Sequence, residues 1–211
     1  MCTMNWYVID IFIIREPQMK SICVYCGSSP GRTEAYSKAA KQLGKSIAER
    51  NIKLVYGGAS VGIMGIVADA VLQYGGQAVG VIPEALVRKE VAHHHLTELH
   101  ITGSMHERKM LMSNLADGFI ALPGGIGTLE EIAEIWTWAQ LGFHKKPFGL
   151  LNIDGYYDSL IAFLDHTLAE QFVRQPHRSM LMVETEPDTL LDRFSSYVAP
   201  DVVKWIGPKE T

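Results

Sequence analysis

The chain has 211 residues, enough for one sizeable domain, and its 47% hydrophobic and 20% charged residues are usual for a globular protein. The formal net charge is −4 and no block of lysines or arginines occurs, which disfavours an extended nucleic-acid-binding surface. The apolar run at residues 8–14 is too short to span a bilayer and lacks the flanks of a signal peptide, so no membrane association is expected.

Residues 1–18 are expected to be an N-terminal extension, unless they reflect a misplaced start site, because Met19 opens a natural start for the domain. If ordered, residues 8–14 should form an added strand or a partner-binding segment. The domain is expected at residues 19–200, and a C-terminal tail at residues 201–211.

Strand-like and helix-like runs alternate along the domain. Strands are expected at residues 21–25, 53–56, 78–82, 98–102, 118–122, 148–152 and 180–183, and helices at residues 34–49, 63–74, 105–116, 129–141, 157–170 and 188–197. This alternation predicts an α/β fold: a single Rossmann-like domain, with an open, mostly parallel sheet and helices on both faces.

The first strand contains Cys23 and Cys26, at the spacing of a redox motif. Side chains three residues apart on a strand point to opposite faces, so a disulfide between them would be hard to close. We therefore expect buried free thiols, which fit a reducing cytosol and a cytoplasmic protein.

Glycine-rich loops follow three of the strands: CGSSPG after the first, YGGASVGIMG after the second and LPGGIGT after the fifth. Ligands bind at the carboxyl ends of the strands in sheets of this kind. Each loop alone could be a tight turn, but three at corresponding ends indicate backbone that approaches a ligand closely.

The helix after the fourth strand is predicted to begin with a capping box of Ser104 and Glu107. Arg108 is in line with apolar residues at offsets of three, four and seven, which places it at the head of a buried stripe. A buried guanidinium needs a partner, either a nearby acid or, bidentately, a phosphate or a ribose-facing carboxylate. Lys109 on the adjacent edge could add charge.

Several histidines, His93, His94, His95, His100 and His106, raise the possibility of a metal site. Consecutive histidines do not readily converge on one ion, and no cysteine joins them. A solvated loop is expected here, and no metal site.

The segment LPGGIGTLEEI places Gly124, Gly125 and Gly127 before a helix that is expected to follow Thr128. The glycines leave the first amide groups of that helix unobstructed, so its positive dipole end is a ready anion site, with phosphate as the natural guest. Thr128 and Glu131 also fit a capping box, which would explain these two residues but not the glycines.

The acids of this helix differ in direction. At 100° per residue, Glu130 and Glu134 lie nearly opposite the apolar stripe and are expected to be solvated. Glu131 flanks the stripe and can face a cleft, so it is the better catalytic candidate, while Glu130 could line the rim.

Together the motifs resemble a known family. PGGIGTLEE fits a PGGxGTxxE signature that ends at Glu131, SMHERK fits an MHxRK motif, and CGSSPG and YGGASVGIMG fit the two earlier loops. Over about residues 19–197 the chain thus resembles the LONELY GUY (LOG) family, the cytokinin riboside 5′-monophosphate phosphoribohydrolases. The resemblance implies hydrolysis of the N-glycosidic bond of AMP and N6-substituted AMP to free base and ribose 5-phosphate, without a cofactor.

The resemblance also implies roles for residues. Arg108 and Glu131 match the catalytic pair, and Glu90 matches a substrate-contacting acid. The other substrate-binding positions match Lys109, Gly124, Gly125, Ile126, Gly127, Thr128, Leu129, Glu130 and Thr137.

The implied chemistry builds an oxocarbenium-like ribose as the C1′–N9 bond breaks. The Glu131 carboxylate would stabilise that charge and orient or deprotonate water, while the held phosphate fixes the ribose against it. Arg108 would either clamp ligand oxygens or hold Glu131 ionised.

Two alternatives stay open. The signature also occurs in molybdenum-cofactor-binding relatives, so the chain could be a nucleotide or cofactor carrier without turnover, or an interaction protein with a vestigial site. Intact Arg108 and Glu131 argue against the latter. Some relatives carry a lysine decarboxylase label, but no lysine here stands in a context that suggests a pyridoxal phosphate Schiff base.

A homodimer or higher homo-oligomer is expected. Members of the family pair through helices beside the active site. The sequence adds Met105, Met110 and Met112, with Trp136 and Trp138, more adaptable apolar surface than one helix face usually buries.

Overall fold

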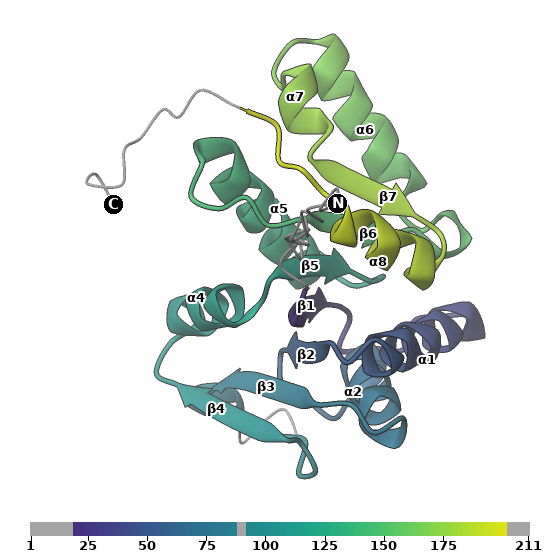
Figure 1. Ribbon diagram of the computed structural model, residues 1–211, viewed down its shortest axis with the longest axis vertical. Coiled ribbons are helices and arrows are strands. Elements are labelled where there is room, and N and C mark those ends of the chain that lie inside the picture. The colour runs from purple at the N-terminus through teal and green to yellow at the C-terminus, as the bar shows by residue number, and fades with distance from the viewer. Residues whose placement is uncertain (1–18, 88–91, 202–211) are drawn as a thin grey trace, which may run out of the picture.

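The computed structural model describes residues 19–87 and 92–201. Within these residues, seven parallel strands form one open sheet in the order β4-β3-β2-β1-β5-β6-β7 (Figure 1). The strands are β1 (Ser21–Tyr25), β2 (Lys53–Tyr56), β3 (Ala78–Pro83), β4 (Glu98–Thr102), β5 (Gly118–Ala121), β6 (Phe148–Leu151) and β7 (Leu181–Glu184). The expected extension at residues 1–18, Glu90 and the tail from residue 202 lie outside the described residues.

Helices cover both faces of the sheet. One face carries α1 (Glu34–Glu49), α2 (Gly62–Gln73) and α8 (Pro187–Ser195), and the other carries α4 (Met105–Leu115), α5 (Ile126–Leu141) and α6 (Asp158–Ala169). The short helices α3 (Glu84–Val87) and α7 (Gln175–Arg178) and the 3₁₀ turn η1 (Ile153–Gly155) were not expected. The prediction of a single α/β domain is confirmed, and the described sheet is wholly parallel.

Two apolar clusters, one under each layer of helices, explain why the strands are continuous apolar runs. Cys26 packs in one cluster and Cys23 in the other, and both are free thiols, as expected from the alternation of side chains on β1. Burial raises the pKa of both thiols, which makes them unreactive.

Two of the residues expected at an interface belong to the core instead. Met112 is buried under α4, and Trp136 is buried under α5, where its indole N–H donates to the carbonyl oxygen of His177 at 2.9 Å. Met105 and Met110 remain exposed on α4. Helical spacing alone did not separate the core methionine from the exposed pair.

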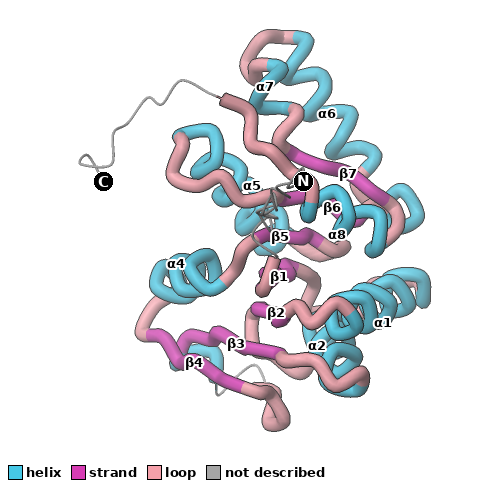
Figure 2. Tube along the Cα trace, in the orientation of Figure 1, coloured by secondary structure: helices cyan, strands magenta, loops and turns pink. Residues whose placement is uncertain are grey.

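The sheet extends from β1 in both directions. The chain runs through β2 and β3 to β4 on one side, then returns to β5 on the other side of β1. The loops after β1 and β5, pink in Figure 2, therefore lead to helices on opposite faces of the sheet, α1 and α5. In open parallel sheets, a crevice at the carboxyl ends of the strands at such a point is where ligands bind.

Candidate functional site

The three glycine-rich loops meet at this crevice. The amide of Gly27, after β1, donates to the carbonyl oxygen of Pro123, after β5, at 3.2 Å. The amide of Ile63, which follows β2, donates to the carbonyl oxygen of Gly27 at 3.0 Å. Loops far apart in the sequence are thus hydrogen-bonded into one surface.

The helix after β5 begins at Ile126, three residues before the expected start at Leu129, and Gly125 is its N-cap. The capping-box alternative is therefore wrong: Thr128 lies inside the first turn, and no side chain caps the helix. The Leu129 amide already closes the first turn on the Gly125 carbonyl at 3.2 Å. The amides of Ile126, Gly127 and Thr128 have no acceptor within the helix, and free amides at a helix N-terminus are the usual donors to a bound anion.

The glycines of this loop have two different roles. A Cβ at Gly124 would lie 2.2 Å from the Thr128 hydroxyl and 2.8 Å from the Gly27 amide, so only glycine fits there. A Cβ at Gly125 or Gly127 would meet nothing within 4 Å. The loop is packed tightly underneath and open at the helix N-terminus, as a phosphate requires.

Arg108 projects from α4 and is only 8% exposed. Its Nη2 donates to the Gly57 carbonyl at 3.3 Å and its Nη1 to the Met105 sulfur at 3.5 Å, while Nε has no partner in the described part of the chain. A Cβ at Gly57 would lie 2.2 Å from Nη2, so the glycine after β2 makes room for the guanidinium. Weak contacts and a free N–H leave this cation with unused donors for a ligand.

Glu131 is partly buried on the second turn of α5. Burial raises the pKa of its carboxyl to about 7, with a smaller contribution from the charges of Glu130 and Glu134, although Arg108 and Lys109 act to lower it. Among the described residues no ion pair joins Arg108 to Glu131. The two charges interact without an ion pair, because Arg108 lowers the pKa of Glu131.

Lys109 joins α4 to α5. Its ammonium contacts the carboxylates of Glu130 at 2.5 Å and Glu134 at 3.1 Å, and its side chain is largely buried. Burial disfavours the charge, but the two hydrogen bonds outweigh this and raise the pKa of Lys109. Glu130 is exposed, as expected, whereas Glu134 is half-buried, and the ion-pair partner of both acids comes from a different helix.

The other residues of α5 that were expected to bind substrate do not all lie at the glycine loop. The side chain of Ile126 is exposed at the mouth of the loop, and Leu129 is partly buried in the core. Thr137 is nine residues after Thr128, about 14 Å along the helix at 1.5 Å per residue. Its hydroxyl donates to the Ala133 carbonyl of its own helix, so the structure does not bring it to the glycine loop.

Two tyrosines at the loop were missed by sequence analysis. Tyr156 and Tyr157, after β6, donate their hydroxyls to the carbonyl oxygens of Gly124 at 2.6 Å and Leu122 at 2.7 Å. The available signal was NIDGYY, a turn sequence with adjacent aromatics at the carboxyl end of a predicted strand.

His93 differs from the expectation of a solvated loop. His93 is buried, and its ring nitrogen Nε2 lies 2.9 Å from the Asp69 carboxylate, whereas His94 and His95 are exposed. Within the described residues, no group of three or more His, Cys, Asp or Glu side chains could hold a metal ion. His93 therefore has a structural partner, on α2.

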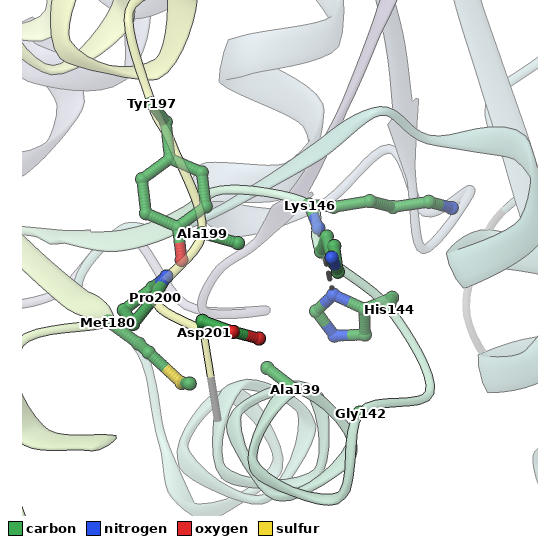
Figure 3. Close-up of a pocket in the computed structure, with 10 residues that line it drawn as sticks. Ala139, Gly142, His144, Lys146, Met180, Tyr197, Ala199, Pro200 and Asp201 are labelled. Carbon is green, nitrogen blue, oxygen red and sulfur yellow. Dashed lines mark hydrogen bonds between the residues drawn. The ribbon is translucent and has the colours of Figure 1, made fainter. Parts of the chain in front are cut away.

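The cavity in Figure 3, about 40 Å³ in volume, lies away from the glycine loops and contains none of the expected site residues. In it, His144 accepts from the Lys146 amide at Nδ1 and lies 2.9 Å from the Ile135 carbonyl at Nε2. Burial lowers the pKa of His144, and its ring joins the middle of α5 to the loop that follows the helix.

The chain is similar in sequence to one family model and to several curated plant proteins. A family model described as "Possible lysine decarboxylase" matches residues 64–194. A probable cytokinin riboside 5′-monophosphate phosphoribohydrolase of Oryza sativa subsp. japonica is 50% identical over 183 residues, 87% of this chain and 74% of that protein. A cytokinin riboside 5′-monophosphate phosphoribohydrolase of Arabidopsis thaliana is 47% identical over 182 residues, 86% of this chain and 84% of that protein.

Solved structures share the fold at lower identity. The molybdenum cofactor binding protein from Rippkaea orientalis has a TM-score of 0.63 and 24% identity, with 84% of this chain and 96% of that chain covered. The molybdenum cofactor carrier protein from Chlamydomonas reinhardtii has a TM-score of 0.64 and 21% identity, with 84% and 96% covered. Similarity at this level shows the fold alone.

None of the helices in residues 19–87 and 92–201 has the length and apolar character that crossing a bilayer requires. The relatives at 44–50% identity align over 86–90% of the chain. The four motifs that suggested the family lie within the folded domain, and three of them meet at its crevice. The chain therefore belongs to the LOG family, the cytokinin riboside 5′-monophosphate phosphoribohydrolases.

Proposed function

We propose that the protein hydrolyses the N-glycosidic bond of AMP and of N6-substituted cytokinin riboside 5′-monophosphates, giving the free base and ribose 5-phosphate. One observation carries the proposal: the second turn of α5, just after the open N-terminus of that helix, holds a carboxyl group whose pKa is about 7 and is lowered by the charge of the buried Arg108 guanidinium. An anion site and a group suited to acid–base chemistry are thus available on the first two turns of one helix.

The phosphate is held by the amides at the start of α5 and by the positive end of the helix dipole. This fixes the ribose beside the second turn of the helix, where Glu131 lies. The ionised carboxylate orients and deprotonates the attacking water and stabilises the positive ribose as C1′–N9 breaks. A pKa of about 7 suits this role, because the group can hold and release a proton at neutral pH.

Arg108 acts on the ligand, and its charge also favours the ionised form of Glu131. Its guanidinium makes no ion pair with Glu131 in the described chain, and its Nε has no protein partner. Because the protein supplies only long contacts to Gly57 and Met105, ligand oxygens are the fitting acceptors for the remaining donors. Lys109, held by Glu130 and Glu134, joins α4 to α5 beside the loop.

The proposal also includes an oligomeric state and a cellular compartment. The enzyme works as a homodimer or higher homo-oligomer, supported by the exposed methionines on α4 beside the site. It works in the cytoplasm, supported by the free thiols Cys23 and Cys26, which a reducing compartment preserves.

The test is incubation of the protein with adenosine, AMP, ADP, ATP and an N6-prenylated AMP, followed by chromatography for the free bases. We expect base release from the two monophosphates, little from ADP and ATP because the short loop has no place for a longer chain, and least from adenosine. Comparable kcat/KM for adenosine and AMP would contradict a phosphate site at the loop. Tight nucleotide binding without base release would instead indicate a carrier.

A further inference from the structure

The carbonyl oxygens of the segment 122–125 are all held by hydrogen bonds. Leu122 accepts from the Tyr157 hydroxyl at 2.7 Å, and Pro123 from the Gly27 amide at 3.2 Å. Gly124 accepts from the Tyr156 hydroxyl at 2.6 Å, and Gly125 from the Leu129 amide at 3.2 Å. Four consecutive carbonyls are therefore fixed in direction, although this is a loop.

Fixing a carbonyl also fixes the amide that follows it. In a planar trans peptide the C=O and the next N–H point in opposite directions. The hydroxyl of Tyr156 on the Gly124 carbonyl therefore turns the Gly125 N–H away from Tyr156. That amide belongs to the N-cap of α5, next to the three free amides of the first turn.

The two tyrosines are not equivalent in this respect. The residue after Leu122 is Pro123, which has no N–H. The hydroxyl of Tyr157 therefore holds a buried carbonyl but orients no amide donor. Tyr156 holds the Gly124–Gly125 peptide. In the segment 122–125, this is the peptide that has an N–H and whose carbonyl oxygen accepts from a side chain.

Tyr156 is itself held in place. Its ring packs edge-on against Tyr36, at 5.6 Å between ring centroids, and against Tyr157 at 4.9 Å. The turn before it contains Asp154 and Gly155, both in the left-handed region, with φ of 50° and 69°. A ring fixed on both sides can fix the peptide it contacts.

We infer that Tyr156 is a positioning residue of the phosphate site, which orients the Gly125 amide toward the bound 5′-phosphate through the Gly124 carbonyl. The inference rests on the proposed function for the identity of the anion. It gives Tyr156 a role in phosphate discrimination and Tyr157 a role in stability only.

The experiment compares Tyr156→Phe with Tyr157→Phe and Tyr36→Phe. Each change removes one hydroxyl from the same aromatic group, and the Tyr36 hydroxyl makes no hydrogen bond among the described residues. We expect Tyr156→Phe to raise KM for AMP and the inhibition constant of inorganic phosphate by about 3- to 10-fold, as loss of one oriented hydrogen bond implies. The kcat for AMP should change less than KM.

The controls should behave differently. Tyr157→Phe should lower Tm, because it strands the buried Leu122 carbonyl, and should leave phosphate inhibition at the wild-type value. Tyr36→Phe should change neither Tm nor the inhibition by phosphate. Equal increases in KM for Tyr156→Phe and Tyr157→Phe, or unchanged phosphate inhibition in Tyr156→Phe, would overturn the inference.

A further measurement separates positioning from direct contact with the ligand. With ¹⁵N-labelled glycine, the Gly125 amide resonance of ligand-free Tyr156→Phe should differ from that of the wild type. An unchanged resonance would overturn the positioning role. If the wild type releases no base from AMP, the proposed function fails, but binding of inorganic phosphate by calorimetry still tests Tyr156.

Discussion

Glu131 combines a functional position with an energetic cost. A carboxylate on an exposed helix face has a pKa near 4.5, whereas partial burial raises the pKa of Glu131 to about 7. The same burial places it beside Arg108 and the start of α5. The properties that make it fit for catalysis also disfavour its ionised form in the folded protein.

We predict that Glu131→Gln binds AMP but turns it over about 10²–10⁴-fold more slowly, because the amide keeps the shape but not the charge. The measurements are kcat for base release and the AMP dissociation constant by calorimetry. Glu134→Gln, one turn along the same helix, is the control and should keep kcat within a few-fold of the wild type. A near-wild-type rate for Glu131→Gln would exclude Glu131 as the base.

The pH dependence of activity follows from the raised pKa of Glu131. Glu131 is protonated below about pH 7 and ionised above it, so kcat/KM for AMP should rise with pH through a limb near 7. The charge of Glu134 helps to raise this pKa, so Glu134→Gln should move the limb to lower pH. Titration of AMP itself would not move between the two proteins. A limb at the same pH in both would assign it to another group.

The stability of the fold should change with pH in the opposite direction to the activity. Because the folded pKa of Glu131 is above the unfolded one, the proton it holds stabilises the fold fully below about 4.5, and this contribution is lost as pH rises through about 7. Glu131→Gln should therefore raise Tm at pH 8 relative to the wild type and have little effect at pH 5. Thermal melts at the two pH values check this, and an equal change at both would contradict it.

Residue positions within one helix were predictable, but contacts between helices were not. The apolar stripe placed Arg108 correctly in a buried position, and helical angle separated Glu131 from Glu130. The lysine that pairs with Glu130 and Glu134 comes from α4, and no periodicity within α5 contains it. Tyr156 was missed for the same reason, because it is 32 residues from the carbonyl it binds.

The start of α5 shows how tertiary contacts override local signals. Thr128 and Glu131 form a good capping sequence, yet the helix begins at Ile126. The Gly27 amide and the two tyrosine hydroxyls hold the residues just before it, so the first turn can start without a side-chain cap. A sequence motif with two explanations was resolved by contacts from β1 and β6.

This arrangement predicts opposite effects for two glycine substitutions. Gly127→Ala should stabilise the protein by about 0.5–1 kcal/mol, since it adds a methyl in open space within a helix. The methyl would narrow the anion site, so KM for AMP should rise on the order of tenfold, about 1.4 kcal/mol. Denaturant unfolding and kinetics measure the two effects.

Gly124→Ala is the matched comparison. Its Cβ would collide with Thr128 and the Gly27 amide, so it should lower both stability and activity. If Gly127→Ala also destabilises, or binds AMP as the wild type does, the open space at the helix start is not the phosphate site.

For the whole molecule, alternation of strands and helices was sufficient to predict the architecture, because each crossover in a parallel sheet has one favoured hand. All seven predicted strands are present within two residues of their expected bounds. The short α3, α7 and η1 were not predictable, since each has only three or four residues and no periodicity. The convergence of the loops followed from the fold, but the contacts between them did not.

Apolar surface is left exposed on α4 and on the edge strand β4. Met105 and Met110 are 43% and 50% exposed, and Leu99 and Ile101 on β4 are also exposed. The outer edge of β4 has no strand paired to it among the described residues. Leu99 is paired with Gly80 and lies on the α2 face of the sheet, so the exposed methionines of α4 are the apolar surface beside the site that suits a contact between copies of the chain.

We predict that the wild-type protein has at least twice the 23.4 kDa mass of one chain by light scattering at micromolar concentration, and that Met110→Glu shifts it toward the monomer. A carboxylate at the centre of an apolar contact would be desolvated without a partner, which disfavours association. Tyr74→Glu is the control, because Tyr74 is equally exposed but ends α2 on the opposite face of the sheet. It should keep the wild-type mass. A wild-type mass of 23.4 kDa would exclude the oligomer, and dissociation by both variants would show that the contact is not at α4.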